Sequence, residues 1–410
     1  MKLAKYLPEF GYTPVVLAAD NPRKTDSDPV LLEQIPPCVR VFRVPVADPF
    51  AGVASLYKTF KNHERGNRGS RERKNTGESF GTRLKRFFSF PDPQFRFLRP
   101  ALSAFFRIPD VYRLTAVINT APPYTGHMLG ARLSRITRLP LVLDYRDAWT
   151  YNPFGGAPTA FHAVGWRLAE QRVLSAASAV VTVTDTMADD YRRRFRLDAP
   201  VITIPNGYDE DDFEGVVPER RGKFTVVYAG TFYAGRDPFT FLDGVRLAIA
   251  SGVFGADDIE IRFIGAASDD VLAAVKASGL PVVMRTCVPH RDAVSEIVSA
   301  HASLLIIGDG PAMGTTLTGK IFEYLRAGRP VIAMVPPGGE AARLIVETDG
   351  GYVVSPDDAD GVAAVLTELY GRYKQGELNE PGTPNSVLKR YDRREIARAY
   401  AELLDSLIGD

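Results

Sequence analysis

The sequence is poor in cysteine, with only Cys38 and Cys287 among its 410 residues. Two cysteines this far apart in the chain form neither a disulfide framework nor the closely spaced ligand set of a zinc site. The scarcity of cysteine therefore excludes both kinds of scaffold and fits a protein of a reducing compartment.

An excess of one charge and long apolar runs are also missing. Lys and Arg total 50 and Asp and Glu total 49, so the net charge is +1 and no overall field points to nucleic acid. No uninterrupted apolar run is long enough to cross a bilayer, and the first residues do not read as a signal peptide. A cytoplasmic protein is the expectation that follows.

What the chain does contain is a repeated pattern of a short apolar run, a turn with Gly or Asn, and an amphipathic stretch. The apolar runs are rich in Val, Ile and Leu and do not alternate with polar residues, which is typical of parallel strands buried on both faces. Helical segments separate them, which predicts right-handed crossovers. The pattern occurs within residues 14–20, 115–136, 139–149, 178–195, 200–209, 224–233, 259–266, 302–310 and 329–337.

These segments form two series that divide near residues 205–222. We therefore predict an α/β protein with two doubly wound, Rossmann-like domains that face a central cleft, the first over residues 1–205 and the second over 206–385. Residues 386–410 follow a helical pattern and either pack on the second domain or cross back to the first. Ligands of such sheets bind at the carboxyl ends of the strands, so the cleft is the expected site.

The start of the chain departs from this pattern. Residues 1–11 (MKLAKYLPEFG) read as a helix, whereas a doubly wound domain normally begins with a central strand. We therefore expect the first strand of the N-terminal domain to be missing. A true start codon upstream is preferred over a truncated product with little activity, because the rest of the chain keeps the residues of a site.

Residues 58–99 form a basic insert, with twelve Lys or Arg and four Asp or Glu. Its second half includes FGTRLKRFFSF, which mixes basic and aromatic residues as a contact with an anionic membrane surface requires. A solvated surface loop accounts for the composition equally well. Nucleic acid is a weaker third interpretation, because no base-reading motif accompanies the charge.

Four motifs in order carry a resemblance to a known family: LPLVLDYRDAWTYNP at 139–153, ITIPNGYDEDDF at 202–213, VVYAGTFYAGRDP at 226–238, and GKIFEYLRAGRPVIA at 319–333. Together they resemble the GT-B glycosyltransferases of family 4 (group 1), retaining enzymes that use sugar nucleotides. The resemblance covers nearly the whole chain. It implies a hexosyltransferase-like enzyme that moves a sugar from a nucleotide-sugar donor to a glycan or lipid-linked acceptor.

For the donor, the resemblance implies that Glu323 binds the nucleotide ribose, since a carboxylate accepts hydrogen bonds from two neighbouring hydroxyls. From the residues alone, Lys320 and Glu323 could equally be an ordinary i, i+3 ion pair. Gly230 and Thr231 follow a predicted strand, where the backbone can approach a phosphate. The loop that carries Thr315 and Thr316 faces the sugar or the diphosphate in this interpretation.

Two of these positions depart from the family pattern. Thr315 stands where a first glutamate is frequent, and Thr231 stands where many members have an arginine. Both departures affect contacts with the donor sugar more than binding of the nucleotide.

For the chemistry, we expect Arg236 to be the main cation for the leaving phosphate and Lys320 the second. Asp147 and Arg146 follow a strand and should face the cleft. His127 begins a helix at another strand end, where it either touches a sugar or caps its helix. The resemblance implies no metal and no cofactor apart from the nucleotide-sugar substrate.

The expected partners are the nucleotide-sugar donor, the acceptor and the anionic inner face of the plasma membrane, which residues 58–99 would touch peripherally. Nucleic acid is not expected. A nucleotide-sugar 2-epimerase shares the two-domain fold and stays open as an alternative activity. A dehydrogenase is the weakest alternative, because no G-x-G-x-x-G follows a strand with an acidic residue about 20 positions later.

Overall fold

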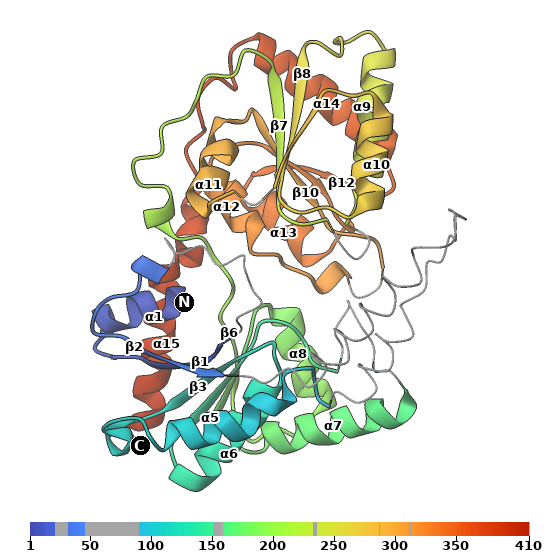
Figure 1. The fold of residues 1–410 in the computed structure, drawn as a ribbon. Coiled ribbons are helices and arrows are strands. Elements are labelled where there is room, and N and C mark those ends of the chain that lie inside the picture. Colours follow the sequence, from blue (N-terminus) through green and yellow to red (C-terminus); the bar gives the residue numbers. More distant parts are fainter. Residues whose placement is uncertain are drawn as a thin grey trace, which may run out of the picture.

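The computed structural model of the protein describes residues 1–20, 32–45, 90–150, 157, 159–232, 236–286, 288–310 and 313–409. Figure 1 shows two lobes, with the first half of the chain in the lower one and most of the second half in the upper one. In the described part of the chain, no helix is long and apolar enough to cross a membrane.

The described residues of the lower lobe form six parallel strands in two sheets. β1 and β2 pair with each other, and the other four follow the order β3-β4-β5-β6. No hydrogen bonds join β1 to β3, so the described strands of this lobe do not form one continuous sheet. The strands are β1 (Val15–Asp20), β2 (Arg40–Pro45), β3 (Val117–Ala121), β4 (Leu141–Tyr145), β5 (Ala179–Thr182) and β6 (Val201–Thr203). The α-helices are α1 (Lys2–Tyr6), α5 (Leu98–Phe105), α6 (Thr125–Thr137), α7 (Ala160–Leu174) and α8 (Asp185–Arg194).

The upper lobe has one six-stranded parallel sheet in the order β12-β11-β10-β7-β8-β9. Its chain runs outward from β7 on one side and from β10 on the other, so the strand order reverses between these two. The strands are β7 (Phe224–Ala229), β8 (Ile259–Ile264), β9 (Val282–Arg285), β10 (Ala302–Ile306), β11 (Val331–Met334) and β12 (Gly351–Val354). The α-helices are α9 (Phe239–Ala250), α10 (Asp269–Ser278), α11 (His290–Ser299), α12 (Lys320–Arg326), α13 (Glu340–Glu347) and α14 (Ala359–Lys374).

Burial is the reason that these segments form strands. Every residue of β4, β5, β10 and β11 is buried, as the runs of Val, Ile and Leu without alternation require. Apolar clusters cover both faces of the upper sheet, one centred on α9 and α14 and the other on α12 and α13. Two layers of helices around parallel sheets confirm the predicted α/β class with two doubly wound domains.

The last helix, α15 (Arg393–Ile408), leaves the upper lobe and runs down the side of the lower one, next to α1 (Figure 1). Its buried side chains, among them Ile396, Tyr400 and Leu404, pack in one cluster with Val142 of β4 and Val181 of β5. The chain therefore passes between the lobes twice.

The two passages lie against each other. The Tyr208 N–H donates to the Tyr391 carbonyl oxygen at 3.0 Å, and the Arg393 N–H donates to the Tyr208 carbonyl oxygen at 2.9 Å. Gly207 fits here because a Cβ at this position would lie 1.8 Å from the Tyr391 carbonyl oxygen. A short hydrogen-bonded ribbon thus joins the linker to the start of α15.

Candidate active site

The point where the strand order reverses, between β7 and β10, is the place where a parallel sheet opens a crevice for ligands. Gly230 follows β7 there with φ of +148°, a conformation that favours glycine. A Cβ on Gly230 would lie 2.0 Å from the Nζ atom of Lys320. The glycine therefore leaves room for the lysine side chain directly over the strand end.

The lysine comes from α12, which β7 holds in place. The Tyr324 hydroxyl accepts a hydrogen bond from the Ala229 N–H at 2.7 Å and lies 3.2 Å from the carbonyl oxygen of the same residue. Ile321, Phe322 and Leu325 bury the opposite side of the helix. This packing turns Lys320 and Glu323 toward the crevice.

Lys320 lies in a confined, positively charged environment. Its Nζ atom is 3.1 Å from the Tyr228 hydroxyl and 4.1 Å from the centre of that ring. Burial first, and then the positive charge of Arg236, lower the pKa of Lys320 to about 8, while Glu323 acts in the opposite direction. Arg236 is itself only 5% exposed. Two repelling cations held together inside a protein favour the binding of an anion between them.

Glu323 is joined to the start of the chain by a line of charged groups. Its Oε1 atom is 3.7 Å from Nε2 of His290, which in turn is 3.2 Å from Oδ2 of Asp212. The Lys2 ammonium donates to the same Asp212 carboxylate at 2.8 Å. Burial raises the pKa of Glu323, and the neighbouring His290 opposes that rise. The hydrogen bond with Asp212 raises the pKa of His290.

Arg393 is a site residue that the sequence analysis missed. It opens α15, and burial followed by the charge of Arg146 lowers its pKa, while Glu323 acts in the opposite direction. Arg393 therefore adds another positive charge near Glu323. One sequence signal could have indicated it, because an arginine at the first position of a helix opposes the helix dipole and needs another reason to be there.

The lower lobe contributes the residues that follow β4. Burial raises the pKa of Asp147, and the positive charge of Arg236 from the upper lobe opposes that rise. The two residues follow the carboxyl ends of β4 and β7, so these ends of the two sheets face each other. This is the arrangement that the sequence predicted.

Arg146 follows β4 but is held by structural partners. Its guanidinium contacts Oδ1 of Asp144 at 2.6 Å and donates to the carbonyl oxygens of Ile204 and Pro205, both at 3.2 Å. It also donates to the Tyr400 hydroxyl of α15. Arg146 thus ties a strand end, the linker and the last helix together.

His127 lies in the interior, beside the last residue of β4. Its Nδ1 atom is 2.6 Å from Oδ1 of Asn119, and its ring packs 4.2 Å from the ring of Tyr145. Burial lowers the pKa of His127 to about 3, so the imidazole is neutral. The side chain is fully buried, and it makes no capping hydrogen bond to α6.

The three threonines named from the sequence lie on the loops that follow β7 and β10. Thr231 is exposed, and its carbonyl oxygen accepts a hydrogen bond from the Tyr228 hydroxyl at 3.2 Å. Thr315 ends a single turn of 3-10 helix (Met313–Thr315), and the Thr316 N–H donates to the Met313 carbonyl oxygen at 3.0 Å. Both are half-buried on the segment that leads into α12.

The sequence and the fold were compared with those of known proteins. Residues 65–212 match the model of Glycosyltransferase Family 4. Sucrose-phosphate synthase from Thermosynechococcus elongatus superimposes with a TM-score of 0.63 at 15% identity, covering 100% of this chain and 92% of that one. The chain has the GT-B fold, and residues 65–212 carry the resemblance to glycosyltransferase family 4. The family resemblance and the enzyme class expected from the sequence are thereby confirmed.

Two further structures have the same fold as this glycosyltransferase. HepE from Anabaena, in complex with UDP and glucose, gives a TM-score of 0.57 at 15% identity and covers 97% of this chain and 100% of its own. The α,α-trehalose 6-phosphate synthase from Burkholderia multivorans gives 0.60 at 12% identity, covering 97% and 98%. None of the curated proteins matches the chain.

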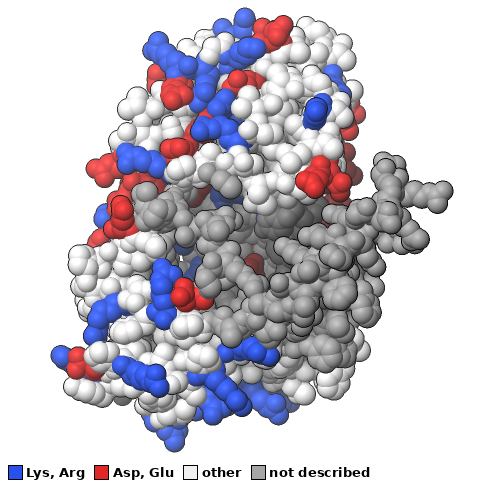
Figure 2. All heavy atoms as spheres, in the orientation of Figure 1, with Lys and Arg blue, Asp and Glu red and all other residues white. Residues whose placement is uncertain are grey.

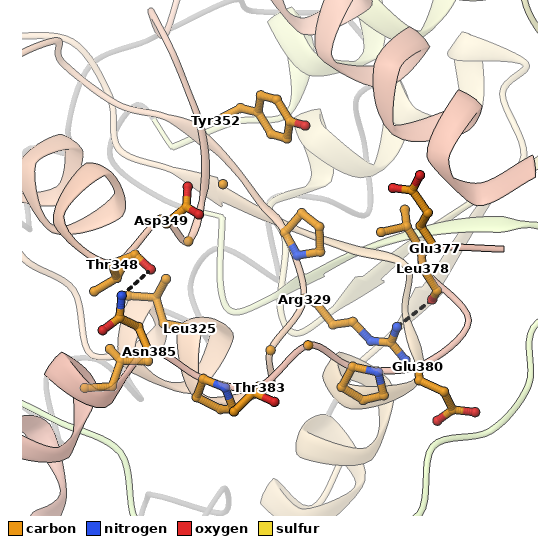
Figure 3. A pocket seen from close by; sticks show the side chains of 18 of the residues that line it. Leu325, Arg329, Thr348, Asp349, Tyr352, Glu377, Leu378, Glu380, Thr383 and Asn385 are labelled. Carbon is orange, nitrogen blue, oxygen red and sulfur yellow. Dashed lines mark hydrogen bonds between the residues drawn. The ribbon is translucent and has the colours of Figure 1, made fainter. Parts of the chain in front are cut away.

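An open pocket of about 620 Å³ lies away from the crevice, at the amino ends of β11 and β12 (Figure 3). Arg329 crosses its wall and donates to the carbonyl oxygens of Leu378 at 2.6 Å and Val298 at 2.9 Å. Burial lowers the pKa of Arg329 to about 10. Through these two hydrogen bonds, the Arg329 guanidinium holds the 376–388 segment against the upper sheet.

Proposed function

We propose that this glycosyltransferase transfers a sugar from a nucleotide-sugar donor to an acceptor hydroxyl with retention of configuration. The observation that carries the proposal is the group of buried cations at the β7–β10 crevice, where Lys320 stands over Gly230 with Arg236 beside it. A nucleoside diphosphate is the anion that such a crevice suits, because it spans a cationic strand end and a ribose-binding carboxylate.

The donor nucleotide lies, in this proposal, with its ribose at Glu323 and its diphosphate at Lys320 and Arg236. UDP-sugars are the first donors to test, since HepE was solved with UDP-glucose and a trehalose-phosphate synthase from Burkholderia vietnamiensis is described as UDP-forming. Arg393 interacts electrostatically with Glu323, so we assign it to the nucleotide side of the site.

The chemistry follows from the charges. The bond between the anomeric carbon and the diphosphate oxygen breaks, and the acceptor oxygen bonds to the same face of the sugar. The acceptor proton passes to the leaving diphosphate oxygen, so no protein nucleophile is needed. Lys320 and Arg236 stabilise the negative charge that builds on the leaving group, and Asp147 keeps Arg236 oriented. These cations supply the stabilisation in our proposal, so we expect transfer without an added metal.

The acceptor is proposed to be a glycan or lipid-linked molecule at the inner face of the plasma membrane. The basic and aromatic composition of residues 58–99 supports this part of the proposal, together with the family resemblance. Most of that segment, residues 58–89, lies outside the described residues.

The test is a thermal-shift screen against UDP, GDP, ADP and their sugar conjugates, because a ligand that binds only the native state raises the melting temperature. We expect one nucleotide to raise it, and the rise to vanish in Glu323→Ala. Glu219→Ala, at a carboxylate that is 68% exposed, is the matched control and should keep the rise. The absence of any shift in the wild-type protein would refute the donor assignment.

A second measurement separates transfer from the epimerase alternative. The nucleotide-sugar that binds is incubated with the protein alone and then with candidate acceptors. Transfer predicts that the donor is consumed with an acceptor present. A sugar nucleotide epimerised at C2 in the absence of any acceptor would instead favour the epimerase.

A further inference from the structure

Helix α7 exposes a stripe of large apolar side chains to solvent. Phe161 is 83% exposed, Val164 60% and Leu168 54%. Their spacing of three and four residues places them on one side of the helix. A water-facing helix normally carries polar residues on that side, so the stripe is out of place on a face that only meets solvent.

The charges on the same helix have one sign at the surface. Arg167 and Arg172 are exposed, and the only acidic residue of α7, Glu170, is buried inside the lobe. Glu170 accepts hydrogen bonds there from the Thr150 hydroxyl at 2.7 Å and the Tyr191 hydroxyl at 2.8 Å. The outer surface of α7 therefore offers apolar and cationic side chains without an acidic one.

The end of α6 extends this surface. The Arg135 guanidinium donates to the Arg172 carbonyl oxygen at 3.0 Å, so the two helix ends meet. Arg132 and Arg138 are exposed beside it, and Ile136 is 52% exposed. The sequence of α6 contains no acidic residue. Along the lowest edge of the molecule, Figure 2 shows Lys and Arg side chains with no Asp or Glu among them.

Other exposed helices of the protein are built differently. On α8, Arg192 pairs with Asp189 at 2.8 Å, and Arg193 pairs with Asp190. On α15, Arg398 pairs with Glu395 at 2.5 Å. These helices balance their cations as solvated faces do. The α6–α7 surface combines unbalanced arginines with an apolar stripe, which is the composition of a helix that lies in a membrane interface.

We propose that the outer face of α7 and the end of α6 dock the protein on an anionic lipid bilayer. Phe161, Val164 and Leu168 enter the boundary between headgroups and acyl chains, and the arginines bind lipid phosphates around them. The docking gives the proposed transferase access to a lipid-linked acceptor. This role of the docking rests on the proposed function. The inference that this surface binds lipid depends only on the exposure and the charge of its side chains.

Vesicle flotation tests the docking with the full-length protein. Wild-type protein should float with vesicles of phosphatidylcholine mixed with phosphatidylglycerol, and much less with phosphatidylcholine alone. Replacing all three apolar residues by serine (Phe161→Ser, Val164→Ser, Leu168→Ser) should weaken the partition by about tenfold or more. Arg167→Gln with Arg172→Gln should weaken it less and reduce its salt dependence.

The matched control replaces three exposed apolar residues of the upper lobe by serine. Val217, Leu272 and Val346 are 77%, 40% and 73% exposed. This control should bind vesicles as the wild type does. Wild-type protein that ignores anionic vesicles would overturn the proposal. Undiminished flotation of the α7 variant would also overturn it and point to the basic segment 58–99 instead.

Two further readouts distinguish lipid docking from self-association and from a failure of donor binding. Sedimentation would reveal a second copy of the chain on this face as a dimer that the α7 variant disrupts, and such a dimer with unaltered flotation would overturn the lipid assignment. The nucleotide thermal shift should be equal in the wild type and the α7 variant. A missing nucleotide shift in both proteins would count against the proposed function and leave the flotation result standing.

Discussion

The two lobes are built from the same type of strand but differ in the surroundings of the cations at their strand ends. In the upper lobe, Lys320 and Arg236 repel each other over a glycine turn, which is a tolerable arrangement when an anion is to be bound. In the lower lobe, the corresponding strand end has Arg146, whose donors are occupied by Asp144, the linker and α15. A cation at a strand end is therefore not by itself a sign of a ligand, because Arg146 serves to tie structural elements together.

Among the substitutions that test this comparison, Arg236→Ala is expected to have the largest effect. Removing a buried cation that we propose to stabilise the leaving group should lower the transfer rate by about 10²–10³-fold, while the fold survives. The measurement is kcat with the donor identified by thermal shift. Arg246→Ala, at an exposed arginine paired with Asp243, is the control and should be fully active. Full activity of Arg236→Ala would remove this residue from the chemistry.

Arg146→Ala should act on stability instead. The substitution leaves Asp144, only 3% exposed, without its cation, and should lower the free energy of unfolding by about 3 kcal/mol. Urea unfolding measures this loss. A variant that keeps wild-type stability but loses transfer would contradict the contrast between the lobes and return Arg146 to the catalytic role expected from the sequence.

The charge on His290, which lies between Glu323 and Asp212, should make the stability of the protein depend on pH. The pKa of His290 is raised in the folded protein, so its contribution to stability is complete below the ordinary value of about 6.5. That contribution is lost as the pH rises through the raised value. Melting temperatures of the wild type between about pH 6 and 9 should show this fall, and His290→Gln should not.

The same variant has a consequence for the donor. Without the imidazolium, which opposes the rise in the pKa of Glu323, that pKa should increase further. The carboxylate would then be protonated at a higher pH, and nucleotide affinity should decline earlier on acidification. Equal pH profiles of nucleotide binding in both proteins would show that His290 does not influence Glu323.

The smallest effect is expected from His127→Gln. The amide side chain can still meet Asn119, and the imidazole that it replaces is neutral and buried. We expect a loss of about 1 kcal/mol in stability and no change in the donor KM. A large change in KM with intact stability would mean that His127 touches a substrate after all.

Much of this fold could be predicted from the sequence because its central strands are continuous apolar runs. Residues 224–233 and 302–310 were expected to contain strands, and β7 and β10 lie within them. Strands β2, β9 and β12 were not predicted. All three lie at sheet edges. β2 and β9 carry exposed arginines, and β12 has only four residues, so they lack the long apolar pattern on which the prediction depended.

The candidate site was predictable in position but not in detail. The rule that ligands bind at the carboxyl ends of parallel strands placed Gly230, Arg236 and Lys320 near one another, and the structure brings them together. The partners of Arg146 and His127 could not be predicted. Tyr400 is 254 residues from Arg146, and Asn119 is on a different element from His127, so only tertiary packing sets these contacts.

The two chain passages between the lobes have a mechanical consequence. A single linker would let the lobes twist, slide and separate, whereas the linker at Tyr208 and the start of α15 are hydrogen-bonded to each other and act as one pin. Such a pin permits the lobes to swing like the leaves of a hinge and resists sliding. Because the lobes would open and close along a single path, the same residues of the lower lobe would face the proposed donor sugar at each closure.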